Sequence, residues 1–116
     1  MSKLMEITIK LVPIYGAGGL PGRLPNLARG LKEFRYEKVL REEPSVYELV
    51  DVLIRLNNDP AVSANFKKPI ASMLEEITKV RDLAREQLLG RQLNELDQTL
   101  YRLEDLFEDL ERELSW

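Results

Sequence analysis

The side chains of this 116-residue chain that could carry acid–base or metal chemistry are almost all carboxylates, because the sequence contains no Cys and no His. Without those residues there is no thiol nucleophile, no Cys/His zinc site and no His-dependent catalytic triad. General acid–base catalysis near neutral pH would then need an Asp, Glu or Lys whose pKa is strongly shifted. The composition therefore favours a binding role over a catalytic one.

Neighbouring acids occur as Glu42-Glu43, Glu75-Glu76, Glu104-Asp105 and Glu108-Asp109. On a helix, successive residues point to different sides, so such pairs do not converge on one metal ion. Glu104 and Glu108 are four residues apart, as in half of a di-metal carboxylate site, but sites of that kind also take His ligands from other helices. We therefore expect no catalytic residue, no bound metal and no cofactor.

A glycine-rich segment spans residues 16–30, with the sequence GAGGLPGRLPNLARG. It contains no G-x-x-x-x-G-K-[ST] pattern, so it does not match a P-loop. The third glycine of a dinucleotide-binding fingerprint is also missing, since Pro21 stands at its position. Five Gly and two Pro in fifteen residues predict a long loop rather than a phosphate-binding turn.

Charge is unevenly distributed along the chain. Residues 1–44 carry 8 Lys/Arg against 5 Asp/Glu, whereas residues 45–116 carry 9 against 15. Because residues 95–113 hold eight acids and two Arg, they would repel phosphate, and we do not expect nucleic-acid binding. A small helical subunit of a ribonucleoprotein complex stays open as an alternative, and its contacts would be Arg23, Arg29, Lys32 and Arg35.

The general composition favours a cytoplasmic protein. No run of 18 apolar residues is present, so no membrane-spanning helix is expected. Charged residues make up 32% of the chain, a charge-rich, Cys-free composition that is typical of thermophiles.

The N-terminal region has the pattern of two strands. The apolar residues Met5, Ile7, Ile9 and Leu11 alternate with polar ones, which predicts a half-buried strand. Residues 31–40 also place apolar side chains at alternate positions and are expected to form a second strand. Two strands this close in sequence most simply pair antiparallel.

A helix is expected after the second strand. Ser45 is followed three residues later by Glu48, the spacing of a capping box, and so predicts a helix N-terminus. The pair Asn57-Asn58 predicts the end of that helix. Asp59 followed by Pro60 predicts the start of another one.

Eight apolar residues of the C-terminal region are spaced alternately by four and three: Leu89, Leu93, Leu96, Leu100, Leu103, Phe107, Leu110 and Leu114. We call this set the seam. Its strict period of 3.5 residues favours coiled-coil packing over an ordinary amphipathic helix. We expect the seam to be the interface of a homo-oligomer, most simply a dimer, or the docking surface for a helix of a partner protein. The spacing leaves parallel and antiparallel arrangements open.

Gly90 lies where the seam changes phase relative to the apolar residues upstream. One alternative is a continuous helix with a local stutter, which would form a long rod. In the other alternative, Gly90 ends one helix and the chain folds back as a helical hairpin.

Together these elements predict an α+β fold. An antiparallel β-hairpin would pack on one capped helix, followed by a long coiled-coil-like C-terminal helix or a helical hairpin. Residues 1–58 would form a β-β-α head, and residues 59–116 a helical segment for oligomerisation or partner binding. The length suits one compact domain overall.

Two resemblances follow from this layout. Within residues 5–56, the stretches MEITIKLVPIYG and RYEKVLREEPSVYELVDVLIRL resemble the β-β-α start of β-grasp proteins of the ubiquitin-like and sulfur-carrier kind. The terminal Gly-Gly of the carriers is replaced by Leu114-Ser115-Trp116, so the resemblance implies a degenerate relative without carrier activity.

The overall layout, a small head and an acidic helical segment, resembles the arcadins, accessory proteins of the crenarchaeal actin-like cytoskeleton. That resemblance implies an archaeal protein with a cytoskeletal accessory role and no active site. The function expected from the sequence is thus a non-enzymatic protein–protein interaction or assembly module.

Overall fold

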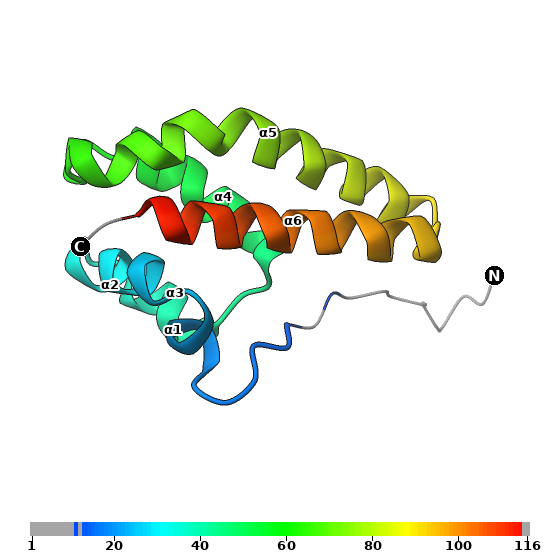
Figure 1. Cartoon of the computed structure of the whole chain (residues 1–116), viewed down its shortest axis with the longest axis horizontal. Helices are drawn as coiled ribbons and strands as arrows, with labels where there is room; N and C mark the ends of the chain where they lie inside the picture. The colour runs from blue at the N-terminus through cyan, green and yellow to red at the C-terminus, as the bar shows by residue number, and fades with distance from the viewer. Residues whose placement is uncertain (1–10, 12, 115–116) are drawn as a thin grey trace, which may run out of the picture.

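The computed structural model describes residue 11 and residues 13–114, and residues 1–10, 12 and 115–116 lie outside the description. Within the described residues the chain forms six helices and no strand (Figure 1). The helices are α1 (Gly19–Arg23), α2 (Pro25–Glu33), α3 (Glu37–Glu42), α4 (Val46–Asn58), α5 (Ala64–Leu89) and α6 (Leu93–Glu113).

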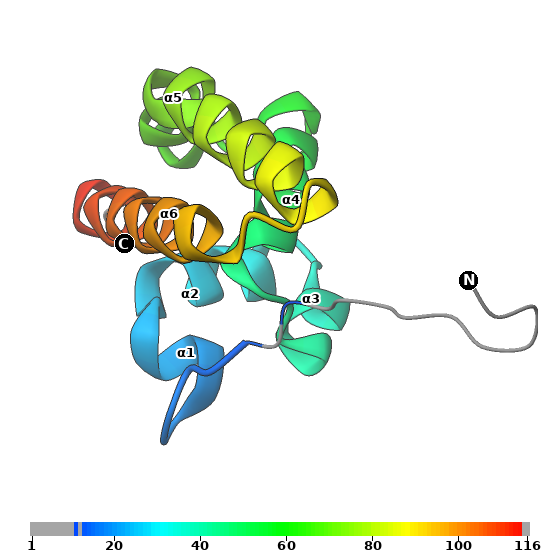
Figure 2. The ribbon, with the colours of Figure 1, turned by 90° about the vertical axis from the view of Figure 1, so that its right-hand side faces the viewer.

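The two longest helices organise the molecule. α5 and α6 run antiparallel along its long axis, and α4 packs against both of them (Figure 1). α1, α2 and α3 gather below one half of α6 in Figure 1, and the turned view in Figure 2 shows α1 and α2 below α6 and α3 below α4. The result measures 50 × 28 × 26 Å. None of the described helices is long and apolar enough to cross a membrane.

The predicted α+β fold is wrong, and so is the β-grasp resemblance. Residues 31–40, the predicted second strand, contain the end of α2, a turn at Arg35 and most of α3. The predicted first strand lies outside the described residues except for Leu11, which belongs to no helix or strand.

Helical spacing explains why residues 20–34 do not form a loop and a strand. Their large apolar residues are spaced by four and three: Leu20, Leu24, Leu27, Leu31 and Phe34. This spacing places them on one face of a helical path, and the four leucines are buried. The long loop predicted for residues 16–30 is therefore also wrong, because its leucines supply enough apolar surface to hold two short helices against the core.

Glycine has a structural role at two points in this segment. Gly18 and Gly19 have φ angles of 87° and 61°, in the left-handed region that glycine adopts without strain. Gly30 is needed for close packing, because a Cβ atom there would lie 2.2 Å from the Phe66 ring of α5. The glycine content that suggested a loop thus serves a turn and a helix–helix contact.

The predicted boundaries of the central helix are confirmed. Ser45 is the N-cap of α4, and its hydroxyl accepts a hydrogen bond from the Glu48 amide at 3.3 Å. The helix ends at Asn58, as the Asn pair predicted. The next start was predicted four residues early. The N-cap of α5 is Ser63, whereas the Asp59 carboxylate accepts a hydrogen bond from the Ala61 amide in the intervening turn.

A pair of reciprocal caps joins the end of α6 to the start of α2. The Glu111 carboxylate accepts hydrogen bonds from the amides of Asn26 at 2.7 Å and Leu27 at 2.9 Å. The Asn26 side chain donates to the Leu114 carbonyl at 2.9 Å. Free amides at the start of α2 and free carbonyls at the end of α6 are thereby satisfied by residues far away in sequence.

Of the two alternatives for Gly90, the helical hairpin is confirmed. α5 ends at Leu89, and Gly90 is its C-cap with φ −83°. Arg91 takes the left-handed conformation instead, with φ 55°, and α6 begins at Leu93. A three-residue turn therefore reverses the chain between α5 and α6.

A single core is shared by residues on both sides of position 58. It includes Leu27 and Leu31 of α2, Leu49, Val50, Leu53 and Leu56 of α4, Phe66, Ile70, Ile77 and Val80 of α5, and Leu103, Phe107 and Leu110 of α6. At the edge of this core the exposed Asp51 of α4 forms an ion pair with Arg81 of α5, with 2.8 Å between its Oδ1 atom and the Nη1 atom of Arg81. The predicted segments 1–58 and 59–116 thus meet at the end of α4 and contribute to the same core.

Candidate interaction surfaces

The structure divides the seam between the core of one chain and its surface. Leu96, Leu103, Phe107, Leu110 and Leu114 are at most 4% exposed, and they are covered by the chain itself. Leu100 is half-buried, whereas Leu93 is 53% and Leu89 75% exposed. Only the end of the seam near the α5–α6 turn is therefore open to another molecule.

The rotation of a straight helix explains this division. A residue repeated every seven positions drifts by about 20° per heptad around an α-helix with 3.6 residues per turn. From Leu114 back to Leu93 the drift is about 60° over three heptads. Leu114 and Phe107 accordingly face the core, Leu100 lies at its edge and Leu93 points outward. In this chain the strict spacing therefore belongs to an amphipathic helix whose apolar face is mostly covered within one chain.

Two core residues of α6 lie outside the seam and were missed. Thr99 and Leu106 are 8% exposed. The signal that could have identified Leu106 is its spacing of three from Leu103 and four from Leu110, which belongs to an ordinary amphipathic helix with a wide apolar face. The Thr99 hydroxyl donates to the Glu95 carbonyl at 2.9 Å, so its burial leaves no unpaired group there.

Residues 79–102 form a two-helix arm, which consists of the end of α5, the turn and the start of α6. In Figure 1 the turn lies at one end of the described helices, away from α1, α2 and α3. Five large apolar side chains are prominently exposed in the described part of the chain, and four of them belong to the arm: Leu83, Leu89, Leu93 and Tyr101. Of these four, only Leu83 lines the groove between the two helices of the arm.

A groove of about 480 Å³ runs between the two helices of the arm. Its lining includes Val80, Leu83 and Gln87 from α5 and Glu95 and Gln98 from α6. The side-chain oxygen of Gln87 is buried and accepts no hydrogen bond from any described residue. A buried acceptor without a donor destabilises the folded state by about 1–3 kcal/mol. A hydrogen-bond donor is therefore missing at this point of the groove.

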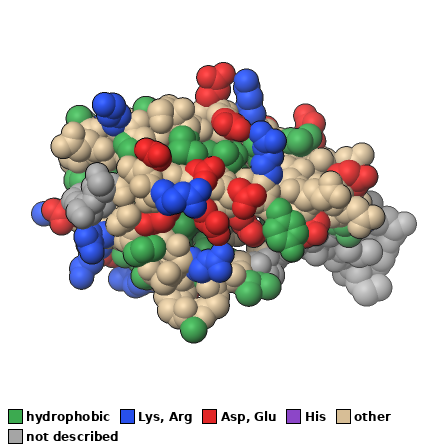
Figure 3. Space-filling view, in the orientation of Figure 1, with side chains coloured by type: hydrophobic (Ala, Val, Ile, Leu, Met, Phe, Trp, Pro, Cys, Tyr) green, Lys and Arg blue, Asp and Glu red, His purple; other side chains and the backbone are tan. Residues whose placement is uncertain are grey.

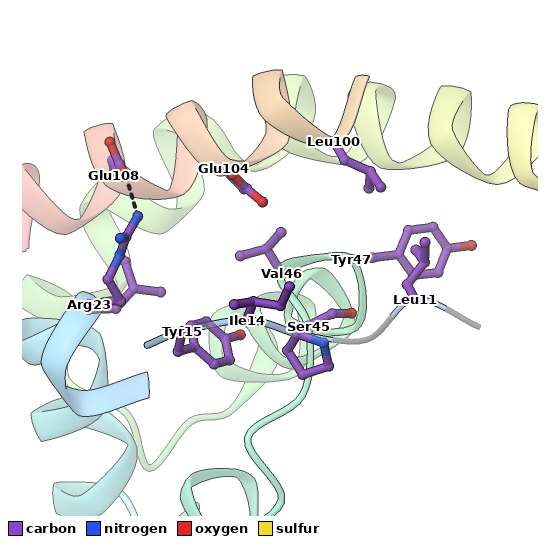
Figure 4. A pocket seen from close by; sticks show the side chains of 12 residues that line it. Leu11, Ile14, Tyr15, Arg23, Ser45, Val46, Tyr47, Leu100, Glu104 and Glu108 are labelled. Atoms are coloured by element: carbon purple, nitrogen blue, oxygen red, sulfur yellow. Dashed lines mark hydrogen bonds and ion pairs between the residues drawn. The ribbon is translucent and has the colours of Figure 1, made fainter. Parts of the chain in front are cut away.

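A smaller cleft lies under the other edge of α6, with a volume of about 200 Å³ (Figure 4). Its apolar wall consists of Leu11, Pro13, Ile14, Val46 and Leu100. Two acids of α6, Glu104 and Glu108, and Arg23 of α1 border the same space. The cleft thus brings together four parts of the chain: the segment before α1, the end of α1, the start of α4 and the middle of α6.

Of the two acids that border the cleft, one forms an ion pair and the other does not. Arg23 forms an ion pair with Glu108 at 3.2 Å, drawn as a dashed line in Figure 4. Glu104 has neither a hydrogen bond nor an ion pair with any residue that the structure describes, and partial burial raises its pKa. Nearby Glu108, Asp105 and Asp97 raise the pKa further, while Arg23 lowers it. Figure 3 shows the acidic side chains gathered over α6.

Tyr15 closes the cleft on the side of α4. Its hydroxyl donates to the Pro44 carbonyl, just before the N-cap of α4. Burial, followed by the negative charges of Glu43, Glu48 and Glu104, raises the pKa of Tyr15 to about 12. The phenol therefore stays protonated and keeps its hydrogen bond over the whole physiological range.

We predict that Tyr15 ionises near pH 12 in the folded protein, two units above the ordinary value of about 10. Between these values the folded state holds a proton that the unfolded state releases, so stability falls as pH rises from 10 to 12. The phenolate absorbance of the wild type minus that of Tyr15→Phe measures this ionisation. A difference curve centred near pH 10 would contradict the prediction.

Of the four basic residues named for the ribonucleoprotein alternative, one is engaged in an ion pair and the other three are exposed. Arg23 is paired with Glu108, as described above. Arg29 and Lys32 are exposed on α2, and Arg35 lies in the turn after it with φ 67°. As for metals, the described residues contain no group of three or more acidic side chains arranged around one point.

Comparison of the chain with protein-family models, with curated proteins and with solved structures found no match. The resemblance to arcadins is also wrong. It depended on a β-β-α head beside a helical segment, and the described head consists of helices that share one core with α5 and α6.

Proposed function

We propose that this protein is a non-enzymatic assembly module that pairs with a second copy of itself through the groove of the arm. The observation that carries the proposal is the buried, unpaired oxygen of Gln87, beside a Leu83 side chain that is 47% exposed. A cytoplasmic location, expected from the sequence, belongs to the same proposal.

The chemistry of Gln87 suits a two-fold symmetric contact. In such an interface the same residue of each copy meets its equivalent near the symmetry axis. The Gln87 oxygen has no exposed surface in the single chain, so pairing requires the side chain to turn into the groove. A primary amide carries both a donor and an acceptor, so two Gln87 side chains turned in this way can satisfy one another. Burial of Leu83 against the second copy adds the apolar contribution.

Charge supports the arm over the rest of α6 as the place of contact. Residues 79–102 carry five basic and four acidic side chains, so two arms do not repel each other. Residues 103–114 carry six acids and one Arg, and two copies facing each other there would repel. A second copy therefore fits the nearly neutral arm best.

Light scattering after size exclusion tests the proposal. We expect the wild type to have twice the 13.4 kDa mass of one chain. Gln87→Glu places two carboxylates together and should weaken the dimer by at least about tenfold, which corresponds to 1.4 kcal/mol. Leu83→Asp should weaken it similarly, because it brings charge into the apolar contact.

The matched controls lie on the same arm outside the groove. Gln92→Glu makes the same chemical change at an exposed position in the turn, and Leu89→Asp does so for the leucine at the end of α5. Both should keep the wild-type mass. A monomeric wild type, or controls that dissociate as readily as the groove variants, would refute pairing through this groove.

A further inference from the structure

We propose that the cleft bordered by Ile14, Leu100 and Glu104 binds a segment of a partner protein in which an apolar side chain is next to a Lys or Arg. This surface is distinct from the arm groove. The groove uses Glu95 and Gln98, whereas the cleft lies against the opposite edge of α6. The inference therefore stands or falls independently of the dimer.

The size of the cleft selects the kind of ligand. Its volume of about 200 Å³ is below the roughly 300–1,000 Å³ of sites that enclose a cofactor or drug-sized molecule. A space of this size accepts one or two side chains. Partner proteins commonly anchor themselves by inserting such a side chain into a small pocket.

The wall of the cleft selects an apolar anchor. Ile14 is 91% exposed, although its side chain points toward the cleft in Figure 4. Leu100 and Val46 are half-buried beside it. An apolar side chain seated between these residues would remove apolar surface from water on both partners, which favours association.

The charge of the cleft selects the neighbour of that anchor. Arg23 already binds Glu108, so the group left without a counter-charge is the Glu104 carboxylate, which points into the cleft (Figure 4). Partial burial and the acids around it raise its pKa, while Arg23, whose ion pair is with Glu108, acts in the opposite direction. A Lys or Arg beside the anchor would supply the missing charge, whereas a phosphate or carboxylate group would be repelled.

Selection from a phage-displayed library of random short peptides on the wild-type protein tests this assignment. We expect the enriched sequences to share a Lys or Arg adjacent to a large apolar residue. A synthetic peptide with that consensus, labelled for fluorescence anisotropy, should bind Glu104→Gln about tenfold more weakly than the wild type. Leu100→Ser should also weaken binding, because it removes part of the apolar wall.

Asp105→Asn is the matched control, because it removes one acid of the same helix at an exposed neighbouring position that does not line the cleft. It should bind the peptide like the wild type, and circular dichroism establishes that all variants fold. The assignment fails if no peptide is enriched, if enrichment favours basic residues without an apolar neighbour, or if Asp105→Asn and Glu104→Gln weaken binding equally.

Discussion

Leu103→Asp is expected to abolish folding, although the seam to which Leu103 belongs has the spacing of a coiled-coil interface. The side chain is 0% exposed within a single chain, in the middle of α6. Removing a buried leucine side chain costs about 2–5 kcal/mol. Burial of an unpaired carboxylate costs several kcal/mol more. The total is comparable with the roughly 5–15 kcal/mol that stabilises a typical domain.

The same substitution at Leu93 is the matched comparison. Leu93 is 53% exposed at the other end of the seam, so Leu93→Asp should change the free energy of unfolding by less than about 1 kcal/mol. Urea unfolding followed by circular dichroism, at one protein concentration, measures both variants. A folded Leu103→Asp with lower mass than the wild type would show instead that the seam is an interface between chains.

Gly30→Leu has the second largest expected effect, a loss of about 3 kcal/mol. The Cβ atom alone would lie 2.2 Å from the Phe66 ring, and that ring is only 3% exposed. Both Gly30 and the ring are buried, so the overlap can be relieved only by displacing part of the core. The usual gain in helix propensity on replacing glycine, about 1 kcal/mol, does not offset this overlap.

Thermal and urea unfolding measure the effect of Gly30→Leu. Ala71→Leu is the control, because it enlarges a small residue at an exposed position of α5 and should change stability by less than about 0.5 kcal/mol. In a Phe66→Ala background, Gly30→Leu should cost much less, since the ring that it overlaps is gone. An equal loss of stability in the wild type and in Phe66→Ala would show that overlap with the Phe66 ring is not the cause.

The parts of the fold that the sequence predicted are those controlled by a few neighbouring residues. Ser45 and Glu48 are three residues apart, and the cap that they form needs no distant partner. The reversal at Gly90 was one of two predicted alternatives, because a glycine at the end of an apolar repeat is also a local signal. At Asp59 a competing local interaction prevailed, because its carboxylate caps a turn rather than a helix.

The parts that were mispredicted depend on distant contacts. Residues 16–40 have enough glycine and enough alternating apolar residues to suggest a loop and a strand. Their helices exist because Leu27 and Leu31 are buried in a core that α4, α5 and α6 also supply, and because Glu111 caps α2 from the far end of the chain. Propensity is a weak guide wherever burial of this kind can override it.

The candidate surfaces show the same limit. The sequence identified the seam leucines as apolar surface that must be covered, and for Leu103, Phe107 and Leu110 that cover is the core of the same chain. It could not locate the groove at Gln87 or the cleft at Glu104. Each lies between elements that are far apart in sequence or separated by a turn, so only their packing creates it.

By itself, then, the sequence determined what local chemistry determines: the chain offers no Cys or His for catalysis, its C-terminal region is helical and acidic, and a helix begins at Ser45. At Gly90 it left two alternatives, between which the tertiary structure decided. The tertiary structure decided which apolar faces are shared within the chain and which remain open. The physical reason is that the hydrophobic stabilisation is roughly proportional to the apolar area that two elements bury against each other. The spacing of apolar residues in one element does not reveal which other element covers them.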